Sequence, residues 1–183
     1  MPEPENGQRS IKIVIAGAST VGKTCMITNY NTNAFSDEHI PNVLDVFKGP
    51  REIDGRQVEI EIVDTSGDNQ LGTNRALVYP NTDCFMLCVA VNNRVTLDLV
   101  NDFKVEIKTV NPRAPILLVG TKKDMRSDSE GCIPKAELEQ QSREMGFQGI
   151  VETSSKEWQD TNIKKAFNQA IKLAYYHKYP DAL

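Results

Sequence analysis

Residues 11–24, with the sequence IKIVIAGASTVGKT, decide how the rest of this chain is interpreted. The stretch begins with a short apolar run, continues into GASTVGKT at positions 17–24, and leads into a segment with a helical pattern. This is the G-x-x-x-x-G-K-[ST] pattern in the context it requires, after a strand and before a helix. Glycines let the backbone wrap around an anion, while successive N–H groups and the positive end of the next helix point at phosphate oxygens. The sequence therefore predicts a phosphate-binding loop, with a ligand-free Gly-rich turn as the alternative.

Two side chains of this loop carry most of its predicted chemistry. Lys23 would reach the β- and γ-phosphates, which also makes it a candidate catalytic residue, and the Thr24 hydroxyl would ligate Mg²⁺. The predicted nucleotide contacts in this part of the chain are Ala18, Ser19, Thr20, Val21, Gly22, Lys23, Thr24 and Cys25.

Composition indicates one globular domain. At 183 residues the chain can bury a core without disulfides or metals, and its 39% hydrophobic and 25% charged residues are ordinary for a soluble protein. A formal net charge of -4 argues against nucleic acid as a partner, because a nucleic-acid-binding surface needs a basic excess. No apolar run approaches the roughly 20 residues that span a bilayer. The four cysteines show no CxxC spacing, so we expect Cys84 and Cys88 to be reduced core residues and not metal ligands.

The hydrophobic periodicity alternates between strand and helix along the chain. Expected strands cover 11–16, 46–53, 58–64, 84–91, 115–120 and 149–153, and expected helices cover 23–33, 96–110, 134–145 and 160–176, with a weak helix before Tyr79. Asp54-Gly55 indicates a hairpin between the second and third strands. This alternation predicts an α/β fold, a single-domain P-loop NTPase with a mostly parallel six-stranded sheet and helices on both faces. We expect the domain to cover 11–177, with tails at 1–10 and 178–183.

Polar motifs follow these strands at the edge where doubly wound sheets bind ligands, beyond the carboxyl ends of the strands. The motifs lie at 17–24, 64–67, 121–124 and 152–156. Asp64 follows a strand and can hold Mg²⁺ beside Thr24, directly or through water. Gly67 can bring a backbone N–H against a γ-phosphate. In isolation, Asp64 and Gly67 would be interpreted as turn formers, but their place behind a phosphate loop favours ligand binding.

Taken together, these motifs resemble those of the small GTPases of the Ras superfamily. The motifs that carry the resemblance are GASTVGKT, DTSG at 64–67, TKKD at 121–124 and ETSSK at 152–156. The Rho branch is the particular match, because YPNTDCFMLCVAV (79–91) and NPRAPILLVGTKKDMRSD (111–128) look like its segments. The resemblance covers roughly residues 11–176. It implies a G domain that binds GTP or GDP with Mg²⁺ and that has two switch loops.

The resemblance assigns recognition of the guanine base to the later motifs. Asp124 matches the carboxylate that accepts hydrogen bonds from guanine N1 and the exocyclic amine, which excludes adenine. Lys122 matches the lysine whose stem lies over the base, and Thr121 replaces the commoner Asn. Phe35 matches the aromatic residue that stacks on the other face of the base, with a half-buried loop anchor as the alternative. The loop whose backbone N–H meets guanine O6 matches Ser154, Ser155 and Lys156.

Three departures from the family pattern concern the γ-phosphate and its hydrolysis. Ser19 stands where the family usually has a second glycine, so its side chain would crowd the γ-phosphate and the space for an arginine finger. Asp68 stands where the family has the glutamine that orients the attacking water, and an ionised Asp is acceptor-only and repelled by a triphosphate. Asn42 replaces the switch threonine, so its ligation of Mg²⁺ is expected to be weaker. The Ser19 and Asp68 pattern, with DTSG for DTAG, is similar to Rho-family members thought to remain GTP-loaded.

We therefore expect a Rho-type GTP-binding signalling switch with slow hydrolysis, in which effector proteins bind the switch loops when the γ-phosphate orders them. Exchange factors and GTPase-activating proteins are the other expected protein partners. The alternative is a pseudo-GTPase, an interaction module with little or no nucleotide cycling. An ATP-using P-loop kinase is disfavoured, because Lys122 and Asp124 stand where guanine is recognised.

The C-terminal sequence bears on location. Residues 179–183 contain no prenylation cysteine and no polybasic run, so they do not support membrane association. We expect a cytoplasmic protein, or one at the inner face of the plasma membrane if a lipidated segment follows.

Overall fold

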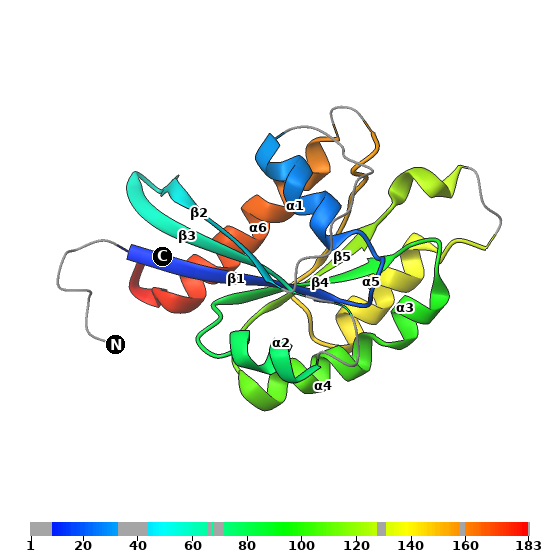
Figure 1. Ribbon diagram of the computed structural model, residues 1–183, viewed down its shortest axis with the longest axis horizontal. Helices are drawn as coiled ribbons and strands as arrows, with labels where there is room; N and C mark the ends of the chain where they lie inside the picture. Colours follow the sequence, from blue (N-terminus) through cyan, green and yellow to red (C-terminus); the bar gives the residue numbers. More distant parts are fainter. Residues whose placement is uncertain are drawn as a thin grey trace.

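A single mixed sheet is the centre of the computed structural model, which describes residues 9–32, 44–65, 67, 72–127, 131–157 and 160–182 (Figure 1). Its six described strands are β1 (Arg9–Gly17), β2 (Leu44–Ile53), β3 (Arg56–Thr65), β4 (Cys84–Ala90), β5 (Ile116–Thr121) and β6 (Ile150–Glu152). Their order across the sheet is β2-β3-β1-β4-β5-β6. Every described pairing is parallel except that of β2 with β3. The expected mostly parallel six-stranded sheet is confirmed.

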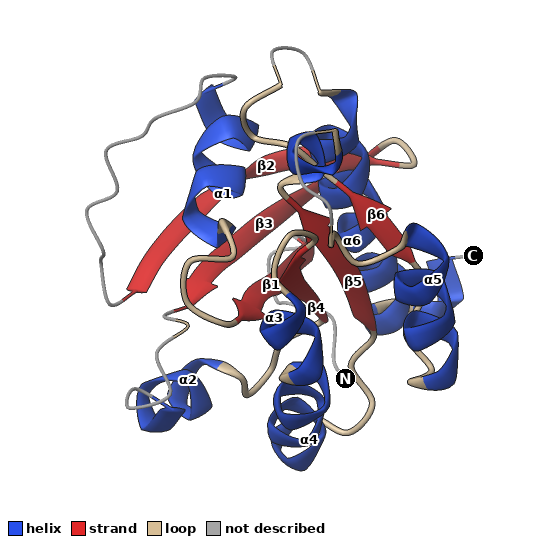
Figure 2. Ribbon diagram, turned by 90° about the vertical axis from the view of Figure 1, so that its right-hand side faces the viewer, coloured by secondary structure: helices blue, strands red, loops and turns tan. Residues whose placement is uncertain are grey.

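Helices cover both faces of this sheet (Figure 2). They are α1 (Lys23–Thr32), α2 (Gly72–Val78), α3 (Arg94–Asp98), α4 (Val100–Val110), α5 (Lys135–Glu144) and α6 (Thr161–Lys178), with short 3₁₀ helices η2 (Lys123–Arg126) and η3 (Pro180–Ala182). The apolar residues of α1 and α6 pack in one core cluster, and those of α3, α4 and α5 pack in the other. No helix in the described ranges combines the length and apolar character that a membrane crossing requires.

The central strand β1 divides the core into these two clusters. Ile11, Ile13 and Ile15 belong to the cluster beneath α1 and α6, whereas Val14 and Ala16 belong to the cluster on the opposite face. Side chains alternate between the faces of a strand, so a strand covered on both faces must be apolar at successive positions. This explains why the run that precedes the phosphate loop shows no polar alternation.

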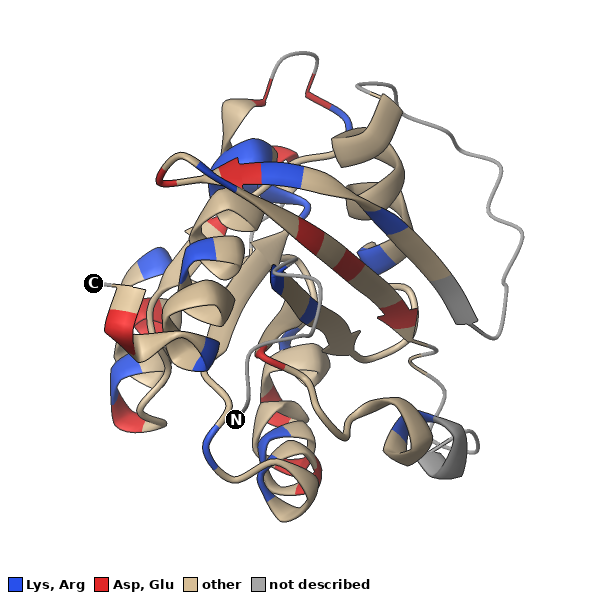
Figure 3. Ribbon diagram, turned by 90° about the vertical axis from the view of Figure 1, so that its left-hand side faces the viewer, with Lys and Arg blue, Asp and Glu red and all other residues tan. Residues whose placement is uncertain are grey.

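The hairpin between β2 and β3 forms at the predicted dipeptide. Ile53 pairs with Arg56, and the two residues between them, Asp54 and Gly55, have φ of 50° and 75°. Positive φ at both central positions is what a two-residue turn requires to match the twist of its strands. The hairpin lies at the edge of the sheet, where Figure 3 shows acidic bands along β3 beside basic bands on β2, and Lys48 pairs with Glu61 at 3.0 Å.

The helix predicted over 96–110 is wrong in its start and its continuity. Asn93 accepts a hydrogen bond from Val95 N at 3.1 Å and so begins α3 earlier than expected, and the helix is interrupted at Leu99 before α4. The Thr96 hydroxyl accepts from Ala90 N at 3.0 Å, which fastens α3 to the end of β4. The break at Leu99 separates α3 from α4, and the apolar periodicity of 96–110 gives no sign of it.

The predicted tails, residues 1–10 and 178–183, include residues that belong to the folded domain. Arg9 and Ser10 belong to β1, and Lys178 belongs to α6, because the two ends pack on each other. The Arg9 guanidinium donates to the Tyr175 hydroxyl and lies 4.7 Å from the ring centroid of Tyr179, whose own hydroxyl is 3.2 Å from Ser10 N. A cation over an aromatic face is favourable, so this contact orders residues that composition alone marks as a polar tail.

Candidate functional site

The phosphate loop connects β1 to α1, as the motif predicts. Gly17 has a φ of 135°, and a Cβ at this position would lie 2.4 Å from the carbonyl oxygen of Cys88 in the neighbouring strand β4. No larger residue could occupy the position without moving β1 away from β4. Gly22 also has a positive φ, 97°, and its carbonyl accepts the N–H of Met26 at 3.0 Å, which closes the first turn of α1. The two glycines of the motif are thus explained by backbone geometry alone.

The Lys23 ammonium lies inside the curve of this loop. Its Nζ donates to the carbonyl oxygens of Gly17 at 3.0 Å and Ala18 at 2.9 Å, and the residue is only 6% exposed. Burial lowers the pKa of the Lys23 ammonium from its ordinary value, and the nearby Asp64 carboxylate acts in the opposite direction. The structure therefore holds a buried ammonium group against two carbonyl oxygens at the centre of the predicted phosphate loop.

Two of the three predicted magnesium ligands, Thr24 and Asp64, meet at the start of α1. The Thr24 hydroxyl donates to Asp64 Oδ2 at 2.5 Å, and the neighbouring Thr65 hydroxyl donates to the carbonyl of Ile15 at 2.7 Å, which fixes the end of β3 against β1. No group of three or more His, Cys, Asp or Glu side chains gathers in the part of the chain that the structure describes. A hydroxyl and one carboxylate fit Mg²⁺, which is usually held by one or two protein oxygens together with phosphates and water.

Gly67 lies directly against the phosphate loop. A Cβ at Gly67 would be 2.2 Å from Ser19 N and 2.5 Å from the carbonyl oxygen of Ala18. Such an approach of two backbones is possible only for glycine. The DTSG motif therefore meets the loop at the position where Ser19 replaces the usual glycine.

The remaining loop residues differ in what they can contribute. Ser19 and Thr20 are exposed, and Thr20 has a left-handed φ of 61°. Val21 is fully buried in the core, so it can offer a ligand only its backbone. Cys25 is half-buried in the first turn of α1.

The TKKD segment lies beyond the end of β5, at the same edge of the sheet as the phosphate loop. Thr121 is buried, and its hydroxyl is 2.5 Å from the carbonyl oxygen of Val21 and 3.0 Å from that of Val89. This side chain therefore faces the protein and links the phosphate loop to β4 and β5. Lys122 follows with a left-handed φ of 59° and is partly exposed, as is Asp124.

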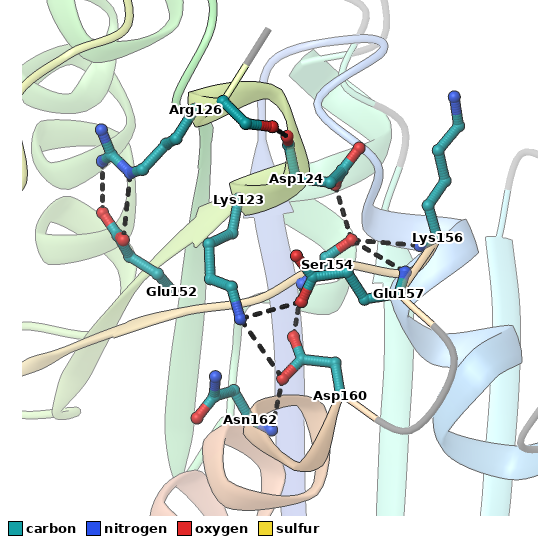
Figure 4. A network of polar contacts seen from close by, with 10 residues as sticks. Lys123, Asp124, Arg126, Glu152, Ser154, Lys156, Glu157, Asp160 and Asn162 are labelled. Carbon is teal, nitrogen blue, oxygen red and sulfur yellow. Dashed lines mark hydrogen bonds and ion pairs between the residues drawn. The ribbon is translucent and has the colours of Figure 1, made fainter.

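The ETSSK segment packs against TKKD through Ser154 (Figure 4). The buried Ser154 hydroxyl donates to Asp124 Oδ1 at 2.6 Å and accepts from the backbone N–H groups of Lys156 and Glu157 at 3.2 and 3.1 Å. The next residue, Ser155, is tied to α1, because its carbonyl accepts from Asn29 Nδ2 at 3.3 Å. The structure thus brings the two motifs predicted to recognise guanine into direct contact.

Comparison with known proteins agrees with this geometry. The sequence profile of the Ras family matches residues 12–176. The chain is 34% identical to the Ras-like GTP-binding protein RhoL of Drosophila melanogaster over 166 residues, which are 90% of this chain and 86% of that protein. It is 33% identical to the Rho-related GTP-binding protein RhoV of Bos taurus, with 97% of this chain and 81% of that protein covered. This chain is a Rho-type small GTPase of the Ras superfamily.

Ras-family GTPases bind GTP or GDP with Mg²⁺, hydrolyse GTP, and work with effectors, exchange factors and GTPase-activating proteins. In this Rho-type chain, the predicted residues of the phosphate loop, Asp64, Gly67 and the two base-recognition motifs lie on one edge of the sheet. Phe35, Asn42 and Asp68 lie outside the described residues, so their predicted contacts to the base, the metal and the attacking water remain predictions.

The sequence analysis did not predict that three charged residues of this Rho-type GTPase contribute to the site. Lys123, which lies within TKKD, contacts Glu157 and Asp160, which follow ETSSK in the sequence (Figure 4). The N-cap pattern, an Asp directly before the last apolar-periodic helix, identifies Asp160 as a helix start. It does not reveal that the same carboxylate contacts both motifs.

Proposed function

We propose that this Rho-type GTPase binds GTP or GDP with Mg²⁺ and acts as a signalling switch whose GTP hydrolysis is slow. The observation that carries the proposal is the link from Thr121 to the phosphate loop. This link connects two groups of side chains at one edge of the sheet. One group, Lys23, Thr24 and Asp64, is suited to a triphosphate with Mg²⁺. The other, Asp124 with Ser154, is suited to guanine.

Tight binding is supported by groups that are already positioned. Lys23 exchanges its carbonyl partners for β- and γ-phosphate oxygens, and the N–H groups at the start of α1 face the same anion. A bound Mg²⁺ would neutralise charge on the β- and γ-phosphates. Asp124 selects guanine because its carboxylate accepts two hydrogen bonds that adenine cannot donate.

Slow hydrolysis is supported by the side chains near the γ-phosphate. Ser19 is exposed, and Gly67 lies against its backbone nitrogen, so the residue that would crowd the γ-phosphate is next to the DTSG motif. Asp68 follows immediately in sequence and lacks the amide that orients water. Because finger access and water positioning serve the same step, their loss would remove most of a stimulated acceleration of about 10³–10⁵.

Effector recruitment is proposed for the two switch segments, residues 34–45 and 66–71. The γ-phosphate would order these segments in the GTP-bound form, and effectors, exchange factors and activating proteins would distinguish the two forms there. Val43, Leu44 and Asp45 belong to the first segment and would contribute to the choice of effector.

The first experiment identifies the bound nucleotide. The protein is purified in Mg²⁺-containing buffer and denatured, and the supernatant is analysed by ion-exchange chromatography. Retained GTP supports a loaded switch, and GDP indicates an active hydrolase. Absence of guanine nucleotide, together with failure to bind added mant-GDP, contradicts the proposal and favours the pseudo-GTPase alternative.

The second experiment measures the rate. Single-turnover hydrolysis of γ-labelled GTP is followed with and without a Rho-family GTPase-activating protein. We expect slow turnover that the activating protein accelerates little. Acceleration of about 10³-fold or more would refute the slow-hydrolysis part while leaving nucleotide binding intact.

A further inference from the structure

We infer that Lys123, Glu157 and Asp160 form a clamp that holds the two base-recognition motifs together, and that Lys123 and Asp160 set how long guanine nucleotide stays bound. The inference rests on the proposed function, because it concerns the same nucleotide site. Lys123 and Asp160 act here as positioning residues, since neither is placed to contact the base itself.

The Lys123 ammonium bridges the two motifs. Lys123 lies within TKKD, and its Nζ is 3.0 Å from Glu157 Oε2 and 3.7 Å from Asp160 Oδ1, both of which follow ETSSK in sequence (Figure 4). Its backbone N–H also donates to the carbonyl of Thr153 at 3.0 Å. Partial burial works against the charge, but the Glu157 and Asp160 carboxylates raise the pKa of the Lys123 ammonium above its ordinary value. The bridge is therefore charged throughout the physiological pH range.

Asp160 is the most buried member of the clamp and makes the most contacts. Its side chain is 3% exposed, its Oδ2 accepts from Ser154 N at 2.7 Å, and its Oδ1 accepts from Asn162 N at 2.9 Å. The second bond caps the N-terminus of α6, where the helix dipole also favours a negative charge. One carboxylate thus joins Lys123, the ETSSK backbone and the last helix.

The position of Ser154 connects the clamp to the base. Its N–H is held by Asp160, and its hydroxyl donates to Asp124, the carboxylate predicted to select guanine. If the clamp opens, Ser154 loses its backbone anchor and Asp124 loses its fixed partner. TKKD and ETSSK would then no longer hold the base in a fixed geometry. The nucleotide would therefore dissociate faster.

The charge of Asp160 is not needed for its capping bond, which allows the clamp to be tested separately from the helix. Asparagine caps helices about as well as aspartate, so its Oδ1 can keep the bond from Asn162 N, whereas its NH2 group is a donor and cannot accept from Ser154 N. What asparagine cannot do is pair with the Lys123 ammonium. Asp160→Asn therefore removes the ion pair with Lys123 and the anchor of Ser154 N, and keeps α6 capped.

The experiment compares release of mant-GDP, chased with excess GDP, from the wild type and from Lys123→Met, Asp160→Asn and the double variant. Lys135→Met is the matched control, because Lys135 is also ion-paired, to Glu139 at 3.8 Å, but within the exposed α5. We expect release about tenfold faster from each clamp variant, since a charge-assisted contact to a buried group is lost. The double variant should be little faster than Asp160→Asn alone, because that variant already removes the pairing of Lys123 with Asp160.

Two further readouts separate positioning from general stability. Release of mant-IDP, which lacks the exocyclic amine, should be accelerated less than release of mant-GDP in the clamp variants, because Asp124 is the group set loose. Lys123→Arg should restore most of the wild-type lifetime. If the clamp variants release mant-GDP at the same rate as Lys135→Met, or accelerate both nucleotides equally, the inference is wrong. If the wild type itself binds no mant-GDP, the result contradicts the proposed function of nucleotide binding, on which the clamp depends.

Discussion

The hydroxyl of Thr121 lies 2.5 Å from the carbonyl oxygen of Val21, so a residue of the TKKD motif is bonded to the middle of the phosphate loop. The same hydroxyl is 3.0 Å from the carbonyl of Val89 in β4. Substitution by the isosteric valine, Thr121→Val, leaves two buried carbonyls without this donor. We expect the free energy of unfolding to fall by about 1–3 kcal/mol, and mant-GDP release to accelerate.

Urea unfolding and stopped-flow release measure these two effects. Thr109→Val is the control, because Thr109 donates to the carbonyl of Val105 at 2.8 Å within the exposed side of α4. If Thr121→Val behaves like Thr109→Val in both assays, the Thr121 hydroxyl contributes neither to stability nor to nucleotide retention.

Restoring the usual residues near the γ-phosphate should increase hydrolysis. In the double variant Ser19→Gly with Asp68→Gln, the side chain that crowds the phosphate is removed and an amide that orients water is supplied. We expect single-turnover hydrolysis to rise about tenfold or more, and the response to an activating protein to rise further. Each single variant should recover less than the double. An unchanged rate in the double variant would contradict the assignment of Ser19 and Asp68.

The meeting of Thr24 and Asp64 predicts that nucleotide release depends on magnesium. Addition of EDTA should accelerate release of mant-GDP from the wild type by about tenfold or more. In Thr24→Val the hydroxyl ligand is gone, so basal release should be faster and the EDTA effect smaller. Thr32→Val, at the other end of α1, should retain the full EDTA response. An EDTA response of wild-type size in Thr24→Val would exclude Thr24 as a ligand.

Gly67 should be intolerant of any side chain. In Gly67→Ala the new Cβ would lie 2.2 Å from Ser19 N, so the phosphate loop and the end of the DTSG motif must move apart. Overpacking of this kind costs about 1–3 kcal/mol, and we expect faster nucleotide release as well. Gly49→Ala serves as the comparison, because its Cβ would approach nothing closer than 3.9 Å. Equal stability of the two variants, measured by urea unfolding, would show that Gly67 does not pack as described.

The buried thiols should be unreactive in the folded protein. Cys84 and Cys88 are fully buried, and burial raises the pKa of the Cys88 thiol to about 12. At pH 8 a thiol-specific reagent such as DTNB should therefore label these two only on unfolding, whereas Cys25 and Cys132 should react first. Because the folded pKa is raised from 9.0, stability is unaffected by this thiol below about pH 9 and falls as the pH rises from there towards 12. Rapid labelling of Cys88 in the native state would contradict its burial.

Sequence patterns predicted much of this fold because its signals are local. Apolar runs such as 84–90 are typical of central parallel strands, and Asp54-Gly55 favours a two-residue turn through φ values that few other dipeptides adopt. The phosphate motif likewise fixes a backbone shape, so the positions of Gly17, Lys23 and Thr24 at the end of β1 and the start of α1 follow from the sequence.

Most of what escaped the sequence analysis depends on contacts between distant segments. The break at Leu99 is different, because it leaves no mark in the apolar periodicity of 96–110. Lys123 has the spacing of an ordinary loop lysine, and only the fold shows that it meets Asp160. Thr121 was expected at the nucleotide, whereas its hydroxyl is directed into the protein, because a short hydroxyl reaches the carbonyls of Val21 and Val89.

The packing of Arg9 on Tyr175 joins residues 166 positions apart, the first strand and the last helix. Strand β1 leads into the phosphate loop, and α6, which packs on one face of β1, is synthesised much later than β1. During synthesis, the loop leaves the ribosome among the first folded elements but must wait for almost the entire remaining chain before its support is complete. We therefore expect the support of the phosphate loop to be complete only after α6 has been synthesised.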